Sequence, residues 1–144
     1  MGKPFEDKHA KIDVIQGDII HDKFLAGVTM SLLMMIHEKA KQSTVDIPLD
    51  LLFCGISMKD KHREDNLHTD HEKDELKDTP IIKVLGIINS DWKDGDGGGF
   101  QHNGILHKLL PGDFIVFDPR LPHKAEDIIT DKKRIAIDWT IRNG

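Results

Sequence analysis

The second part of the sequence is divided into short apolar segments by closely spaced turn residues. After Pro80, glycine, proline, asparagine and aspartate recur at intervals of about ten positions, between segments rich in isoleucine, valine and phenylalanine. The first segment, 81–88, is almost continuously apolar, as in a strand that is covered on both faces. The later segments are 105–110, 113–117, the residues after His123, and 134–141. Regularly spaced short strands of this kind are typical of a β-sandwich or β-barrel.

The first part of the sequence contains a helical pattern. Asp22 stands in the N-cap position before apolar residues that recur at helical spacing, and the pattern ends near Ser43. A short apolar alternation over 12–14 indicates a strand before the helix, and alternation over 45–53 predicts a half-buried strand after it. Residues 1–10 are polar and are expected to form a flexible tail.

The segment 57–79 is dominated by charged residues and histidine. Such a segment is too polar for a core element, so we predict a surface loop or a short solvated helix. Because it contains potential metal ligands, we expect it to form part of the entrance to a site and to influence substrate specificity.

Length, charge and cysteine content narrow the function classes. A chain of 144 residues corresponds to a single domain, 1–144. A net charge of −5 argues against nucleic-acid binding, because binding to phosphates requires a surplus of basic residues. No apolar stretch is long enough to span a bilayer, and the first residues lack the apolar core of a signal peptide. The single cysteine, Cys54, excludes an internal disulfide, so we expect a protein of the reducing cytoplasm. Because no apolar stretch could span a bilayer, we expect no membrane association.

Nine histidines make a metal site worth testing, since histidine is the commonest metal ligand. His68 and Asp70 are separated by one residue, so on a strand both side chains would lie on the same face and could reach one cation. Alone, this pair is a weak signal. His123 follows Pro122, which restricts the backbone and helps to orient the imidazole. The alternative for His123 is a surface position at the end of a hairpin.

The last segment has two distinct faces. Ile135, Ile137, Trp139 and Ile141 share the face expected to pack in the core, whereas Arg134, Ala136, Asp138 and Thr140 share the other. At the mouth of a barrel, the guanidinium of Arg134 could bind a carboxylate through two hydrogen bonds. The alternative is an exposed strand face on which Arg134 pairs with Asp138.

Two histidines and one carboxylate form the facial triad of non-haem Fe(II) oxygenases, which leaves positions open for a chelating cosubstrate and dioxygen. In the order of its motifs, residues 12–142 of this sequence resemble the 2-oxoglutarate/Fe(II)-dependent oxygenases, specifically their prolyl 4-hydroxylase-like branch. The resemblance rests on the following motifs: His68-Thr69-Asp70, Ile87-Ile88-Asn89-Ser90-Asp91-Trp92, Gly97-Gly98-Gly99, Pro111-Gly112-Asp113, His123 and Arg134-Ile135-Ala136-Ile137.

The resemblance implies a mainly β fold, a double-stranded β-helix or jelly roll with an N-terminal helix packed on one sheet. It implies that His68, Asp70 and His123 bind the catalytic Fe(II) and that Arg134 binds the remote carboxylate of 2-oxoglutarate. The implied reaction couples oxidative decarboxylation of 2-oxoglutarate to succinate and CO2 with O2-dependent hydroxylation. A carboxylate at Asp70, where a smaller residue would leave room for halide, favours hydroxylation over halogenation.

The implied substrates are a peptidyl proline, another peptide or protein residue, or a small molecule, and ascorbate is a further cofactor that the resemblance suggests. Two positions depart from the family pattern: Ile87 occupies a place where a tyrosine often stands near the cosubstrate, and Thr140 occupies the usual place of the tryptophan in the last strand.

The sequence is compatible with two other functions. The first is a cupin-like metalloprotein without 2-oxoglutarate, an isomerase or a direct dioxygenase, which would have no use for Arg134. The second is a non-catalytic binding module on the same barrel, against which the intact set of His68, Asp70 and His123 argues.

Overall fold

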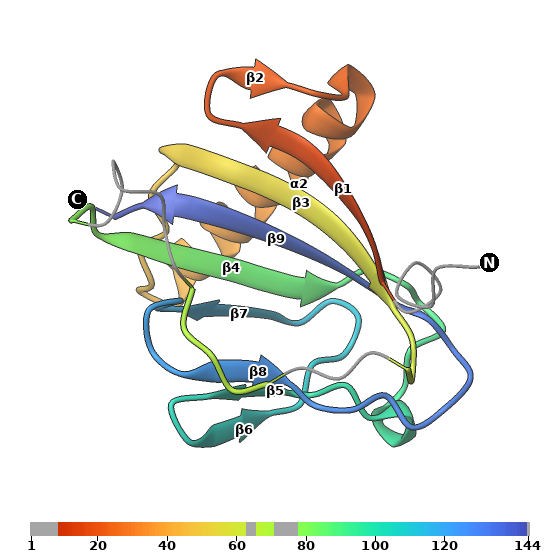
Figure 1. Ribbon diagram of the computed structural model, residues 1–144. Coiled ribbons are helices and arrows are strands. Elements are labelled where there is room, and N and C mark those ends of the chain that lie inside the picture. Colours follow the sequence, from red (N-terminus) through yellow and green to blue (C-terminus); the bar gives the residue numbers. More distant parts are fainter. Residues whose placement is uncertain (1–8, 63–65, 71–77, 144) are drawn as a thin grey trace.

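Two antiparallel sheets and one long helix form the computed structural model, which describes residues 9–62, 66–70 and 78–143 (Figure 1). The strands are β1 (His9–Gln16), β2 (Ile19–Ile20), β3 (Leu51–Lys59), β4 (Ile81–Ile87), β5 (Phe100–His102), β6 (Ile105–His107), β7 (Phe114–Phe117), β8 (His123–Ala125) and β9 (Arg134–Arg142). The helices are α2 (Lys23–Gln42) and the 3-10 helix η2 (Asp94–Asp96).

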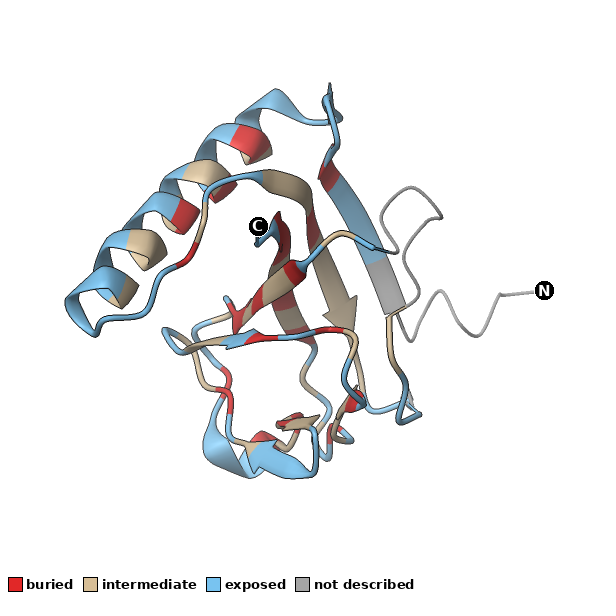
Figure 2. Cartoon of the chain, turned by 90° about the vertical axis from the view of Figure 1, so that its left-hand side faces the viewer, coloured by how far each residue is buried: buried red, intermediate tan, exposed pale blue. Residues whose placement is uncertain are grey.

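The large sheet has six strands in the order β2-β1-β3-β9-β4-β7, and the small sheet has three in the order β6-β5-β8. In the large sheet β9 lies between β3 and β4, far from both in the sequence, and the pairing of all neighbours is antiparallel. The helix α2 lies across one face of the large sheet, and the small sheet lies on the other side (Figures 1 and 2). The prediction of a mainly β jelly roll with an N-terminal helix packed on one sheet is confirmed.

Two hydrophobic cores lie on opposite faces of the large sheet. The first is between this sheet and α2, and it contains Leu33 of the helix together with Ile137, Trp139 and Ile141 of β9. The second is between the two sheets and contains Ala136 of β9 with residues of the small sheet and its loops. Because successive side chains of a strand point to opposite faces, β9 contributes Ile137, Trp139 and Ile141 to the first core and Ala136 to the second.

The helix begins as the sequence predicts. The carboxylate of Asp22 accepts a hydrogen bond from the backbone N–H of Leu25 at 2.9 Å, which satisfies one of the free N–H groups of the first turn. The helix ends at Gln42, and the backbone N–H of Ser43 donates to the carbonyl of Ala40. Within the described residues, no helix combines the length and the apolar character that crossing a membrane requires.

Two boundaries predicted from the sequence are wrong. Residues 45–50 form no strand, because this segment runs back along the helix: His37 hydrogen bonds through Nδ1 to the carbonyl of Ile47, whose side chain is buried against α2. Residues 57–59, expected in a surface loop, instead belong to β3. Ser57 and Lys59 are polar because they line a cavity, and polarity alone does not distinguish a cavity wall from solvent.

The N-terminal prediction also changes. Positions 9 and 10, which were expected in a flexible tail, belong to β1 and pair with the end of β3. Residues 1–8 lie outside the described residues.

The contact between α2 and the large sheet can be tested by two substitutions on the same helix. Leu33→Ala removes a side chain that is completely buried and should lower the free energy of unfolding by about 2–5 kcal/mol. Met35→Ala, at a position that is 68% exposed, should change it by no more than about 0.5 kcal/mol. Chemical denaturation of the two variants measures both values, and equal destabilisation would contradict this packing.

Candidate metal centre

The backbone brings the predicted ligands together. His68 and His123 form an antiparallel bridge in which the N–H of each donates to the carbonyl of the other, at 3.0 and 2.8 Å. The backbone N–H of Asp70 donates to the carbonyl of Pro119 at 2.9 Å. The short segment that carries His68 and Asp70 is thereby attached to β8 and to the turn before it, although the two parts of the chain are far apart in sequence.

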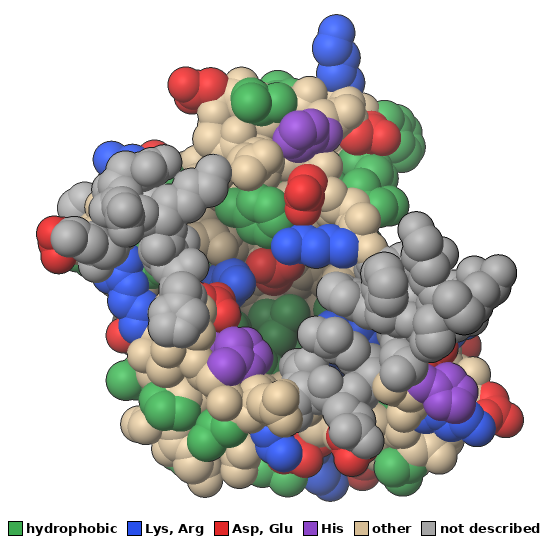
Figure 3. All heavy atoms as spheres, viewed as in Figure 1, with side chains coloured by type: hydrophobic (Ala, Val, Ile, Leu, Met, Phe, Trp, Pro, Cys, Tyr) green, Lys and Arg blue, Asp and Glu red, His purple; other side chains and the backbone are tan. Residues whose placement is uncertain are grey.

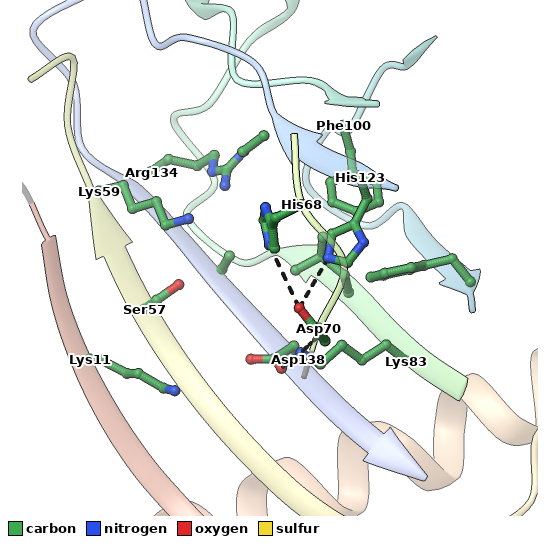
Figure 4. Close-up of a pocket in the computed structure, with 14 residues that line it drawn as sticks. Lys11, Ser57, Lys59, His68, Asp70, Lys83, Phe100, His123, Arg134 and Asp138 are labelled. Atoms are coloured by element: carbon green, nitrogen blue, oxygen red, sulfur yellow. Dashed lines mark hydrogen bonds and ion pairs between the residues drawn. The ribbon is translucent and has the colours of Figure 1, made fainter. Parts of the chain in front are cut away.

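The side chains of these three residues point toward one another (Figure 4). One ligand atom from each of His68, Asp70 and His123 lies within 4.8 Å of the other two. Oδ1 of Asp70 is 3.2 Å from Nε2 of His123 and 3.6 Å from Nε2 of His68. His123 is buried, whereas His68 is exposed, so the group has one side in the protein interior and one side open.

Hydrogen bonds determine which ring nitrogen of each histidine can bind a metal. Nδ1 of His68 is 2.7 Å from the carbonyl oxygen of Asn66, and Nδ1 of His123 is 2.8 Å from that of Leu121. A carbonyl oxygen only accepts, so both Nδ1 atoms carry hydrogen and donate it. In the neutral imidazole the lone pair is then on Nε2, which faces Asp70. Metal-binding histidines are oriented in the same way, and this donor set therefore fits a divalent cation.

Lys83 of β4 stabilises the carboxylate of Asp70. Its Nζ lies 2.7 Å from Oδ2 of Asp70 and 3.6 Å from Oδ2 of Asp138 on β9. Burial disfavours the charged form of Asp70, but the hydrogen bond with His123 and the charge of Lys83 outweigh it and hold the pKa of Asp70 well below its usual range. For Asp138 burial prevails over the attraction of Lys83 and raises the pKa of this carboxyl.

The three residues border a cavity of about 200 Å³ between the sheets. Its wall is formed by strands of both sheets, and Figure 3 shows the hollow in this face of the molecule with acidic and basic side chains around it. Among the described residues that line the cavity, the further charged or hydroxyl-bearing ones are Lys11, Ser57, Lys59, Lys83, Arg134 and Asp138. Although the chain is acidic overall, the part of the cavity lining that the structure describes has four basic side chains and two carboxylates, which favours an anionic ligand.

Arg134 is buried at the start of β9 and lines the same cavity. Its Nη1 donates a hydrogen bond to the carbonyl of Gly98. Gly98 has a φ of +67°, and a Cβ there would lie 3.0 Å from the ring of Trp92 and 3.2 Å from Cδ of Arg134. The glycine turn at 97–99 thus makes room for the arginine. The alternative in which Arg134 stands on an exposed strand face is wrong, because Arg134 is buried.

The two departures from the family pattern have clear positions. Ile87 is buried in the core between the sheets and lies outside the cavity lining, so it provides no polar contact there. Trp139 packs in the core against α2, and the buried Thr140 stands on the opposite face of β9. Neither Ile87 nor Thr140 lines the cavity.

Sequence reasoning missed Lys83 and Lys59. A signal for Lys83 exists: it interrupts the apolar segment 81–88, and a charge in the middle of a covered strand requires a partner. Lys59 lies in a segment rich in charges, so nothing in the sequence distinguishes it from its neighbours.

Divalent-metal binding tests the donor set. We expect His123→Ala and Asp70→Asn to lower the affinity for Co(II) at least about 10-fold, whereas His21→Ala, at an exposed histidine outside the group, leaves it unchanged.

Burial lowers the pKa of His123, but its hydrogen bond with Asp70 outweighs burial, so the pKa is raised overall. Because the metal requires the neutral ring, affinity should fall as the pH falls through that raised pKa. Calorimetric titration over a pH series measures both effects, and unchanged affinity in the two variants would refute the assignment.

This chain resembles known proteins in its structure. No protein-family model matches the sequence, and no curated protein matches it by sequence similarity. A Pseudomonas putida prolyl-4-hydroxylase superposes with a TM-score of 0.62 at 17% identity, over 94% of this chain and 73% of that one. A viral collagen prolyl hydroxylase from Paramecium Bursaria Chlorella virus-1, solved as a 2-oxoglutarate complex, gives 0.57 at 13% identity, over 93% and 78%.

A prolyl 4-hydroxylase structure from Phytophthora capsici gives a TM-score of 0.56 at 19% identity, and the match covers 92% of this chain but 47% of that chain. At such identities the likeness concerns the fold. The chain therefore shares the double-stranded β-helix fold of these prolyl hydroxylases.

Proposed function

We propose that this protein is a 2-oxoglutarate- and Fe(II)-dependent dioxygenase that hydroxylates its substrate. The observation that carries the proposal is the convergence of His68, Asp70 and His123 in one cavity with the buried Arg134. The fold supports it, because the similar structures include prolyl hydroxylases, one of them a 2-oxoglutarate complex.

His68, Asp70 and His123 would hold the iron through two imidazole nitrogens and a carboxylate oxygen, a combination that suits Fe(II). When bound, iron and 2-oxoglutarate would supply the activation of dioxygen: the cosubstrate is converted to succinate and CO2, one oxygen atom enters the new carboxylate of succinate and the other enters a C–H bond of the substrate. The chain supplies the positions of the ligands and the orientation of the reactants.

Each supporting residue has a specific task in this proposal. The carbonyls of Asn66 and Leu121 keep the Nε2 lone pairs of the two histidines directed at the metal position. Lys83 keeps Asp70 ionised and limits its rotation through the 2.7 Å contact. Arg134 would bind the remote carboxylate of 2-oxoglutarate, and the surrounding apolar side chains, including Phe100 and Phe117, reduce access of water.

For the substrate we propose a peptidyl proline, on the basis of the three prolyl hydroxylases that share the fold. The role of ascorbate remains a prediction from the resemblance. A cupin-like activity without 2-oxoglutarate is less well supported, because it would give Arg134 and the basic lining of the cavity no ligand.

The proposal predicts a visible metal-to-ligand charge-transfer band when Fe(II) and 2-oxoglutarate are added under anaerobic conditions. His68→Ala and Asp70→Ala should abolish this band, since each removes a metal ligand. Arg134→Ala should keep the band but raise the concentration of 2-oxoglutarate required for it more than about 10-fold, because a buried charged partner is lost. Absorption titration of folded protein measures all three effects.

Two further measurements decide the outcome. His21→Ala, an exposed histidine, is the control variant and should titrate like the parent protein. A folded parent protein that gives no band would refute the proposed function. Succinate release measured across proline-containing peptides and free amino acids then tests the substrate, and stimulation only by free amino acids would refute the peptidyl proline.

A further inference from the structure

The charged residues of the cavity are separated into two groups. Among the described lining residues the two carboxylates, Asp70 and Asp138, both lie close to Nζ of Lys83, at 2.7 and 3.6 Å. Lys11 belongs to the same group, because its charge also acts on Asp138. Lys59 and Arg134 lie together on another side of the cavity, beyond His68 (Figure 4). One part of the cavity wall therefore combines both signs of charge, while another presents two cations.

Strand pairing places these two cations next to each other. In the antiparallel pair of β3 and β9, Lys59 is the direct partner of Arg134. Side chains of direct partners stand on the same face with Cβ atoms about 4.5–5.5 Å apart. Two cationic side chains so placed on one cavity wall can bind the same anion.

The next pair on the same face leaves space for such an anion to extend toward the metal ligands. Ser57 is the direct partner of Ala136, and both line the cavity. These side chains are small, so the cavity continues past them, and the hydroxyl of Ser57 adds a hydrogen-bond donor to its wall. Cations at one end, small residues in the middle and the metal ligands beyond them suit an elongated anion.

We propose that Lys59 is a second cationic anchor for the remote carboxylate of 2-oxoglutarate and acts together with Arg134. This inference rests on the proposed function, and it adds a binding residue on β3 that the sequence motifs did not indicate. A carboxylate has two oxygens with several lone pairs, so it can accept hydrogen bonds from a guanidinium and an ammonium group at the same time. Ile87, buried in the core, takes no part in this contact.

The test compares two keto acids that differ in the remote carboxylate. 2-Oxobutyrate has the same metal-chelating end as 2-oxoglutarate but lacks the second carboxylate. We expect Lys59→Met to raise the dissociation constant for 2-oxoglutarate about 10-fold, because a charge-assisted hydrogen bond is lost, and to leave that for 2-oxobutyrate unchanged. Lys59→Arg, which keeps the charge, should restore most of the affinity. Anaerobic titration of the charge-transfer band with Fe(II) present gives each constant.

Lys61→Met is the matched control, since Lys61 lies on the surface, where its Nζ contacts Asp131 at 2.6 Å, and it should bind both keto acids like the parent protein. Unchanged 2-oxoglutarate binding in Lys59→Met would overturn the anchor and leave the proposed function intact. Equal weakening for both keto acids would also overturn it, because Lys59 would then act on the site as a whole. A parent protein without any band would overturn the proposed function, and the anchor with it.

Discussion

Two backbone hydrogen bonds between His68 and His123 hold the candidate site together. They fix the backbone positions of both residues, and the two imidazole rings consequently lie side by side, with centroids 4.5 Å apart. A third backbone bond, from Asp70 to the carbonyl of Pro119, places the carboxylate opposite them. The arrangement of the three donor groups therefore results from chain pairing, and a preorganised site of this kind needs little rearrangement when it binds a metal.

The double role of β9 connects this site to the stability of the fold. Trp139 and Ile141 pack against the helix side, whereas Arg134, Ala136 and Asp138 face the cavity. Because the strand is fixed by apolar packing on one face, its polar residues on the other are held in position without contributing to that packing. The core against α2 and the chemistry of the cavity thus depend on the same strand register.

Much of this could be read from the sequence, for identifiable reasons. Turn residues between apolar segments predicted the β fold, Asp22 predicted the start of the helix, and the period of two in the last segment predicted which residues of β9 face the core. The structure places His68, Asp70, His123 and Arg134 around one cavity, although their roles as ligands remain predictions. By contrast, the alternation over 45–53 was misleading, because packing along a helix can produce the same apolar pattern as packing in a sheet.

The sequence by itself determined the fold class, the faces of the strands and the donor types of the candidate site, because these depend on local residue order and periodicity. Only the tertiary structure decided that Lys59 stands opposite Arg134, that Lys83 contacts Asp70, and that Ser57 lines the cavity. The physical reason is register: which residues of distant strands become partners depends on the simultaneous pairing of several strands, and local pattern contains no information about that choice.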